Sequence, residues 1–419
     1  MPILLEMRRA RAVRTCLVAA GLAAFPAAGA GALSPPGASG CPVFPADNVW
    51  HSDISKLPVH PRSAAWMASM DGASTDLHPD FGSSGEPMPY GIPYTVVGSS
   101  HADVPVDFSY PDESDPGPYP FGTDTPIEGG SDRHAIMIDR DACTLYELFD
   151  AEYAPGGGST AGSGAIWNLK SNALRPAGWT SADAAGLPIF AGLVRLDEVK
   201  AGKVDHAIRM TASQTDRSFV WPARHQAGAT SNKNLPPMGA RFRLKASFST
   251  SGFRSDTKTI LAAMKKHGMI LADNGSDWYF TGAASDDWSN DMLDELKSVP
   301  ASAFEAVDAS SLMISPNSGK AKQSGGAAPA PAPAAPKPKP KPKPSIPPSP
   351  SPLPAATATP TPVASSVVTT SPSPSTLGIA SGNGSRAGGT EPPWWLLALA
   401  GVSGAGGLLL VGYKRRHAG

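Results

Sequence analysis

Two short stretches of the sequence place an aspartate next to a histidine at the start of an apolar segment. They read Asp132-Arg-His134-Ala-Ile and Asp205-His206-Ala-Ile. In an extended chain each histidine begins a row of apolar side chains on one face, because alternate residues of a strand share a face. Such a histidine is either a hydrogen-bonded core residue or an acid–base residue oriented by its carboxylate neighbour. The sequence leaves both interpretations open.

A loop rich in aromatic and polar residues supplies a second candidate site. It runs over 172–188 and contains Arg175, Trp179 and Asp183. Tryptophan can stack on a sugar ring, arginine can hold hydroxyls or carboxylates, and a carboxylate can transfer protons. The alternative is an ordinary loop in which Trp179 belongs to the core.

A third candidate is the sequence Trp221-Pro-Ala-Arg224-His225, which ends an expected strand. An arginine and a histidine at the end of a strand suit an anionic or hydroxylated ligand, although an exposed loop is the better explanation for them. We therefore predict a substrate-binding set that consists of Arg175, Trp179, Trp221, Arg224 and His225.

Together these residue types favour a carbohydrate-active enzyme that acts on cell-wall or environmental polysaccharide. A glycoside hydrolase would need two carboxylates roughly 5 Å or roughly 6.5–9.5 Å apart. A polysaccharide lyase would use a histidine as base and Arg175 to neutralise a uronate. The predicted catalytic residues are Asp132, His134, Asp183, Asp205 and His206.

Two other functions remain open from the sequence. The domain could be a non-catalytic glycan-binding or adhesive module, or a metal-dependent enzyme that uses two histidines and a carboxylate. HExxH, GxSxG, P-loop and CxxC motifs are absent from the sequence, so no strong motif decides between them. Convergence of His134, His206 and Asp183 on one cleft would favour an enzyme, whereas wide separation would favour the adhesive function.

An acidic stretch around residue 113 offers one cofactor hypothesis. Asp112, Glu113 and Asp115 supply the hard oxygen ligands that Ca²⁺ prefers on an extracellular loop. Their spacing is not that of an EF-hand, and a solvated acidic face explains them equally well. No other metal or cofactor is predicted.

The net charge of the chain conceals three differently charged segments. The 419 residues contain 35 Lys and Arg against 36 Asp and Glu, a formal charge of −1. Residues 41–318 carry −13 and residues 319–419 carry +9. The acidic excess of the central segment argues against a nucleic-acid partner. We expect a monomer that binds polysaccharide or a cell-wall polymer.

The two ends of the chain predict its compartment. Residues 1–30 combine four arginines, a short apolar stretch and an Ala-Gly-Ala exit, as in a secretory signal peptide. Residues 394–413 are twenty uncharged residues with aromatic residues at both ends, followed by a basic tail over 414–419, as in a transmembrane helix with a cytoplasmic end. This predicts a single-pass membrane protein at the bacterial cell surface. The helix is either a retained anchor or part of a sorting signal that is cleaved.

Between domain and anchor, residues 319–393 form a linker rich in Pro, Ala, Lys and Ser with few large apolar side chains. Such a composition cannot bury enough surface to fold, so we expect disorder and an extended spacer. In the exported part, Cys41 and Cys143 form an even pair, which predicts one disulfide in an oxidising compartment.

Residues 41–318 are expected to form one β-rich domain of the sandwich or jelly-roll type, with a few peripheral helices and a C-terminal α+β portion. Short segments rich in Val, Ile, Phe and Tyr alternate with Gly and Pro, which is typical of this class. The expected strands are 92–97, 104–110, 134–139, 144–149, 165–169, 189–196, 206–211, 218–221 and 240–246. The expected helices are 63–70, 256–267 and 288–296, with a hairpin around Asn274-Gly275.

Several phrases of the domain resemble a family of secreted bacterial proteins that is mostly uncharacterised. They are Phe44-Pro-Ala-Asp-Asn48, Leu77-His-Pro-Asp-Phe-Gly82, Asp132-Arg-His-Ala135 and Ala182-Asp-Ala-Ala-Gly-Leu-Pro188. The resemblance covers roughly residues 41–308. It implies a single exported module and carries over no catalytic residue.

Overall fold

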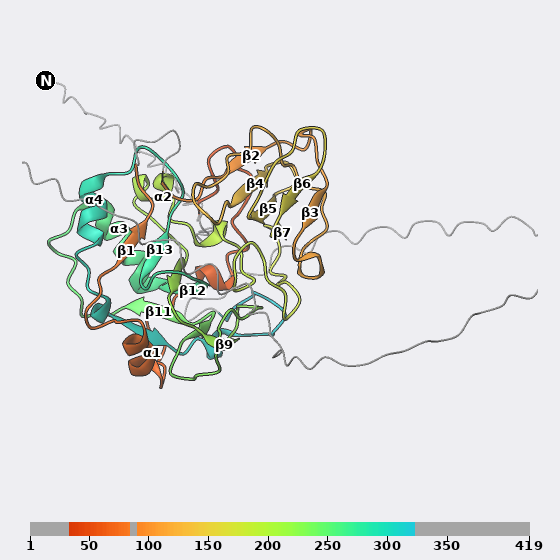
Figure 1. Cartoon of the computed structure of the whole chain (residues 1–419). Helices are drawn as coiled ribbons and strands as arrows, with labels where there is room; N and C mark the ends of the chain where they lie inside the picture. Colours follow the sequence, from red (N-terminus) through yellow and green to blue (C-terminus); the bar gives the residue numbers. More distant parts are fainter. Residues whose placement is uncertain (1–32, 84–89, 323–419) are drawn as a thin grey trace, which may run out of the picture. The chain divides into compact units, whose positions relative to one another are not determined.

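Short strands joined by turns make up most of the regular structure, with few helices (Figure 1). The computed structural model describes residues 33–83 and 90–322. The predicted signal peptide, the transmembrane helix, the cytoplasmic tail and almost all of the linker lie outside the described residues. Within the described ranges, no helix is long and apolar enough to cross a membrane.

The largest sheet has six strands in the order β1-β13-β8-β12-β11-β14. Its strands are β1 (His78–Asp80), β8 (Ile208–Ala212), β11 (Arg241–Leu244), β12 (Met269–Asn274), β13 (Tyr279–Thr281) and β14 (Phe304–Val307). The predicted hairpin is wrong, because β8 lies between β12 and β13 and pairs with both. Ile208 and Met210 of β8 are fully buried, so this apolar strand gains more at the centre of the sheet than at an edge.

A second sheet has four strands in the order β2-β4-β5-β7. They are β2 (Thr95–Val97), β4 (Ala135–Asp139), β5 (Thr144–Phe149) and β7 (Ser163–Asn168). All five residues of β4 are buried, because the sheet is covered on both faces. Ile136 and Ile138 face the main core, whereas Ala135 and Met137 face a smaller core that also contains Val106.

Two strand pairs complete the β-structure. β3 (Val106–Phe108) pairs with β6 (Ser159–Ala161), and β9 (Asp216–Phe219) pairs with β10 (Pro237–Met238). The expected strand over 189–196 is wrong. Phe190–Gly192 forms a 3-10 helix, because the Glu147 carboxylate accepts the N–H groups of Ile189 and Phe190 at 3.1 and 2.8 Å, so these amides bond to a side chain and not to a sheet.

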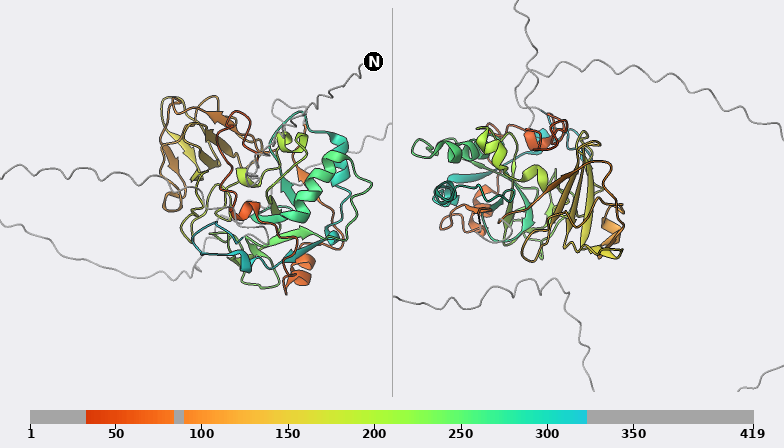
Figure 2. Two further views of the ribbon diagram at one scale, coloured as in Figure 1. Left: turned by 180° about the vertical axis from the view of Figure 1, so that it is seen from behind. Right: turned by 90° about the horizontal axis from the view of Figure 1, so that it is seen from above.

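The helices lie at the periphery. They are α1 (Ser63–Ser69), α2 (Leu196–Lys200), α3 (Ser255–Lys266) and α4 (Asn290–Leu296). Figure 2 shows α3 and α4 on the side of the domain opposite to the four-stranded sheet. The folded part continues past residue 318, since Lys320 pairs with Asp47 at 3.0 Å and Gly319 accepts the N–H of Val49 at 2.8 Å.

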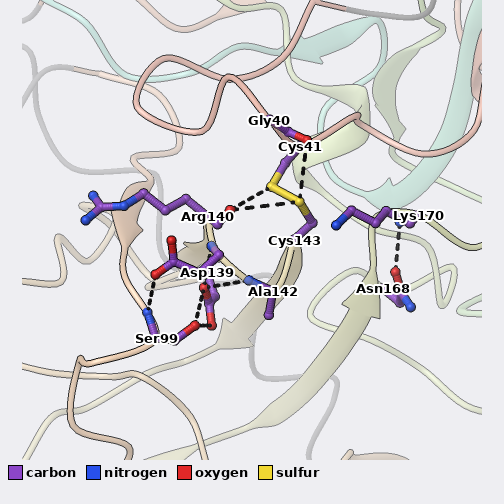
Figure 3. The surroundings of a disulfide bond; sticks show 10 residues. Gly40, Cys41, Ser99, Asp139, Arg140, Ala142, Cys143, Asn168 and Lys170 are labelled. Carbon is purple, nitrogen blue, oxygen red and sulfur yellow. Dashed lines mark hydrogen bonds between the residues drawn. A yellow bond between two sulfur atoms is a disulfide. The ribbon is translucent and has the colours of Figure 1, made fainter.

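The predicted disulfide between Cys41 and Cys143 is confirmed (Figure 3). It links the start of the folded part to the turn between β4 and β5. In that turn the Asp139 carboxylate accepts the N–H groups of Asp141 and Ala142 at 2.8 and 3.1 Å, which fixes the backbone before Cys143. The bond joins residues 102 positions apart, so it strongly reduces the conformational entropy of the unfolded chain.

Removing this disulfide is expected to lower the free energy of unfolding by about 2–4 kcal/mol, the usual cost for a long loop. The measurement is urea unfolding of the Cys41→Ala/Cys143→Ala variant against the oxidised parent. Reduction of the parent should reproduce the loss, and an unchanged midpoint in both experiments would contradict the expectation.

Candidate functional site

Arg209 is the centre of a buried polar cluster between the two large sheets. Its Nε and Nη2 donate to the two carboxylate oxygens of Asp183 at 2.9 and 3.0 Å. Nη2 also donates to Asp273 Oδ2 at 2.8 Å, and Nη1 donates to Thr281 Oγ1 at 3.2 Å. The side chain of Arg209 is only 5% exposed, so its hydrogen-bond donors are used by other groups of the protein and not by solvent.

Asp183 and Asp273 form a pair of neighbouring carboxyl groups. One nitrogen of Arg209 bonds to both, and the two groups lie within hydrogen-bonding reach of each other. Burial and the charge of Asp183 raise the pKa of Asp273 to about 7, although Arg209 acts in the opposite direction. Burial likewise raises the pKa of Asp183. The pair therefore holds one proton up to about neutral pH.

The two members of this pair differ in access to solvent. The Asp183 side chain is fully buried, whereas that of Asp273 is 21% exposed. Asp183 is also fixed by both of its bonds to Arg209, so it cannot contact a ligand. Of the two, only Asp273 has side-chain surface in contact with solvent, and its Oδ1 accepts the N–H of Asn274 at 2.7 Å.

His134 connects the four-stranded sheet to the loop that carries Asp183. Its Nδ1 bonds to the Glu128 carboxylate, and its Nε2 lies 3.2 Å from the carbonyl oxygen of Ala182. Burial alone would lower the pKa of His134, but the Glu128 carboxylate raises it above the usual value. Both partners of the ring are acceptors, so the geometry suits an imidazolium that donates from both nitrogens. It positions the loop and places a positive charge near both carboxyl groups of the pair.

The loop before Asp183 is held by local hydrogen bonds. Ser181 Oγ donates to the carbonyl of Leu187 at 2.6 Å and accepts the N–H of Asp183 at 2.9 Å. Gly186 has φ of +66°, and a Cβ there would lie 2.4 Å from the carbonyl oxygen of Trp179. A larger residue at position 186 would displace the loop, which explains the glycine at this position of the phrase.

Asp80 and Tyr90 lie on the accessible side of the cluster. The Tyr90 hydroxyl donates to the Asp80 carboxylate, and burial raises the pKa of Asp80. In the register of the sheet Asp80 is the partner of Thr281, which binds Arg209. Asp132 is exposed, and its negative charge raises the pKa of both His134 and Asp273. The accessible side is therefore rich in carboxylates.

Of the five predicted catalytic residues, His134 and Asp183 belong to this cluster, and Asp132 acts on it through its charge. Asp205 and His206 bind other partners. Asp205 accepts hydrogen bonds from Lys266 and His267, which hold the pKa of its carboxyl well below the usual range. His206 pairs with the buried Glu198 at 3.1 Å, so the expected convergence of His134, His206 and Asp183 on one cleft is not met. The two similar phrases thus occupy different environments, because the strands they begin belong to different sheets.

The predicted substrate-binding residues are largely engaged within the protein. Arg175 donates to the carbonyls of Thr180 and Glu113 at 2.7 and 2.8 Å, and Arg224 donates to the carbonyls of Arg175 and Pro316 at 2.6 and 2.5 Å. Both guanidinium groups hold loops in place through hydrogen bonds to backbone carbonyls. The Trp221 indole donates to the Ser318 carbonyl at 2.9 Å, whereas Trp179 and His225 are half-buried.

The acidic stretch proposed for Ca²⁺ is also engaged. The Asp115 carboxylate binds the guanidinium of Arg175, and the Glu113 carboxylate accepts the N–H of Thr180 at 3.0 Å. Asp112 is exposed. Among residues 33–83 and 90–322, no group of three or more His, Cys, Asp or Glu side chains could hold a metal ion.

Sequence reasoning missed Arg209, Asp273, Glu128, Asp80 and Tyr90. Two of them could have been found from the sequence. Arg209 stands between the apolar residues Ile208 and Met210, and Asp273 lies near the end of an apolar strand. A charge in such a position needs a buried partner of opposite charge.

Replacing His134 by Gln is expected to raise the pKa of Asp273 above 7, because a nearby positive charge is lost. The measurement is a carbon-13 NMR titration of the aspartate carboxyl groups in the full-length protein. His101→Gln is the matched control, since His101 also pairs with a carboxylate, that of Asp124, but at the surface. An unchanged pKa of Asp273 in His134→Gln would contradict this role.

The chain matches no protein-family model, no curated protein and no solved structure. The chemistry of the cluster therefore has to be inferred from its own geometry.

Proposed function

We propose that the domain is a glycoside hydrolase that cleaves neutral polysaccharide, with Asp273 as the general acid. The observation that carries the proposal is a partly exposed carboxylic acid paired with a fully buried carboxylate. The pKa of about 7 keeps Asp273 protonated at mildly acidic pH, as a proton donor to a leaving oxygen requires.

In the proposed reaction Asp273 gives its proton to the glycosidic oxygen as the bond from that oxygen to the anomeric carbon breaks. Asp132, which is exposed on the accessible side, accepts a proton from the water that attacks the anomeric carbon. The hydroxide part of the water becomes the new hydroxyl of the sugar. Asp183, Arg209 and His134 hold Asp273 in place and do not contact the substrate.

Hydrolysis is favoured over the lyase reaction by the charge of the cluster. A lyase acting on a uronate needs a cation that neutralises the substrate carboxylate. Arg209 is bound to two aspartates and a threonine, and His134 to Glu128 and a carbonyl, so neither is available for this purpose. Asp80, Asp132 and Glu128 would instead repel an anionic sugar.

We further propose that the enzyme acts at the bacterial cell surface, attached by the C-terminal apolar segment. This rests on the composition of residues 1–30 and 394–419 alone. Fractionation of the host cells with an antibody against the folded domain tests it, and recovery of the protein in the cytosol would contradict it.

The test of the proposed function is a screen of the full-length protein against neutral and acidic polysaccharides. Reducing ends and unsaturated products are measured separately. We expect new reducing ends from a neutral polymer and no unsaturated product. Binding to a polymer without any cleavage would favour the non-catalytic glycan-binding function, and unsaturated products would favour the lyase.

A further inference from the structure

A cavity of about 160 Å³ lies next to Tyr90, at the edge of the six-stranded sheet. Its walls come from β1, from the residues that follow β1, and from α4, which packs against β1 (Figure 1). The side chains that give it its chemistry are those of His78, Tyr90, Asn290, Leu293 and Lys297.

The cavity is connected to the acid cluster through β1. His78 and Asp80 are alternate residues of this strand, so their side chains leave the same face about 7 Å apart. Tyr90 contributes to both places, because its ring lines the cavity and its hydroxyl donates to Asp80. Asp80 in turn is the register partner of Thr281, which binds Arg209. Asp273 lies on β12, three strands from β1 in the sheet, so a ligand that joins the two places must span on the order of 14 Å.

The lining is polar and contains a planar ring held in a fixed orientation. His78 stacks on Tyr279 with ring centroids 3.9 Å apart and 16° between the planes. Burial lowers the pKa of His78, so its ring is neutral at physiological pH. Lys297 lies 3.2 Å from the carboxylate of Asp294, which offsets its charge. Asn290 supplies an uncharged donor and acceptor.

We propose that this cavity is a subsite that binds one neutral glycosyl unit of the substrate, a hexose or an N-acetylhexosamine, a few units away from the bond that Asp273 protonates. This inference rests on the proposed function. A sugar ring offers hydroxyls to Tyr90 and Asn290 and C–H groups to Leu293 and the histidine ring. A uronate would meet the carboxylate of Asp80, while the lining cation Lys297 is already paired with Asp294.

Binding can be measured on full-length Asp273→Asn, in which turnover is blocked, with hexasaccharides of glucose and of N-acetylglucosamine and with oligogalacturonate as the acidic comparison. Removing a central ring or amide from such a subsite by His78→Ala or Asn290→Ala should weaken binding of the preferred neutral hexasaccharide roughly tenfold or more. His60→Ala is the matched control, because His60 also stacks on an aromatic residue, Trp66, at 4.1 Å, but away from the cavity.

Thermal unfolding of each variant checks that the fold is kept. Unchanged affinity in both His78→Ala and Asn290→Ala would overturn the subsite while leaving the hydrolase proposal intact, provided that the wild-type protein cleaves the polymer. Tighter binding of oligogalacturonate than of either neutral hexasaccharide would overturn the assignment to neutral sugars. Failure of the wild-type protein to cleave any polysaccharide would count against the proposed function itself.

Discussion

Replacing Asp273 by Asn is expected to reduce polysaccharide cleavage by about 10²–10⁴-fold, the usual contribution of a general acid. The amide has the shape of the carboxylic acid but has no proton to transfer. Its oxygen can still accept from Arg209, and its nitrogen can donate to Asp183 in place of the shared proton. Stability should therefore change little, which separates loss of chemistry from loss of fold.

The measurement compares initial rates of reducing-end release and midpoints of thermal unfolding for the variant and the wild-type protein. Asp287→Asn is the control, since Asp287 is an exposed aspartate whose partner is the surface residue Lys200. Wild-type turnover in Asp273→Asn would contradict the role of Asp273 as the acid. A similar loss in both variants would show that the effect is not specific to the cluster.

Replacing Arg209 by Met is expected to lower the free energy of unfolding by about 3–5 kcal/mol, because the charge of the buried Asp183 then lacks its cation. The pKa of Asp183 is raised by burial, so the group can escape this penalty by taking up a proton. The loss should therefore be smaller at acidic pH and should grow as the pH rises.

Urea unfolding at several pH values measures this effect. The double variant Arg209→Met/Asp183→Leu should recover part of the lost stability, because no charge remains buried without a partner. Arg254→Met is the control, as Arg254 pairs with Asp256 at the surface and should contribute little. An equal effect of Arg209→Met and Arg254→Met would contradict the ion pair as the centre of the cluster.

Features that depend on local sequence were predictable. The strand over 144–149 has the expected boundaries in β5, and α3 is shifted by one residue at each end, because an alternating apolar pattern and a helical pattern are properties of consecutive residues. The disulfide followed from the two cysteines of residues 41–318. His134 could be proposed because it follows an aspartate at the start of an apolar strand, and Asp183 because it shares a loop with Arg175 and Trp179.

Features that depend on distant residues were not predictable in this way. The turn at Asn274-Gly275 suggested a hairpin, yet the strand that separates β12 from β13 is β8, more than fifty residues earlier in the chain. The partner of Asp183 was missed for the same reason, since Arg209 reaches it from β8. The expected strand over 189–196 does not form, because the amides of Ile189 and Phe190 bond to the side chain of Glu147, about forty positions away.

The most direct test of the proposed hydrolase is the pH dependence of reducing-end release from a neutral polysaccharide, in the wild-type protein and in Asp273→Asn. The acid must be protonated to act, and its pKa is about 7. We predict that wild-type activity is present below neutral pH and is lost as the pH rises through about 7, while Asp273→Asn shows almost no activity at any pH. Wild-type activity that increases above pH 7, or a variant that follows the same profile at the same rate, would contradict the account.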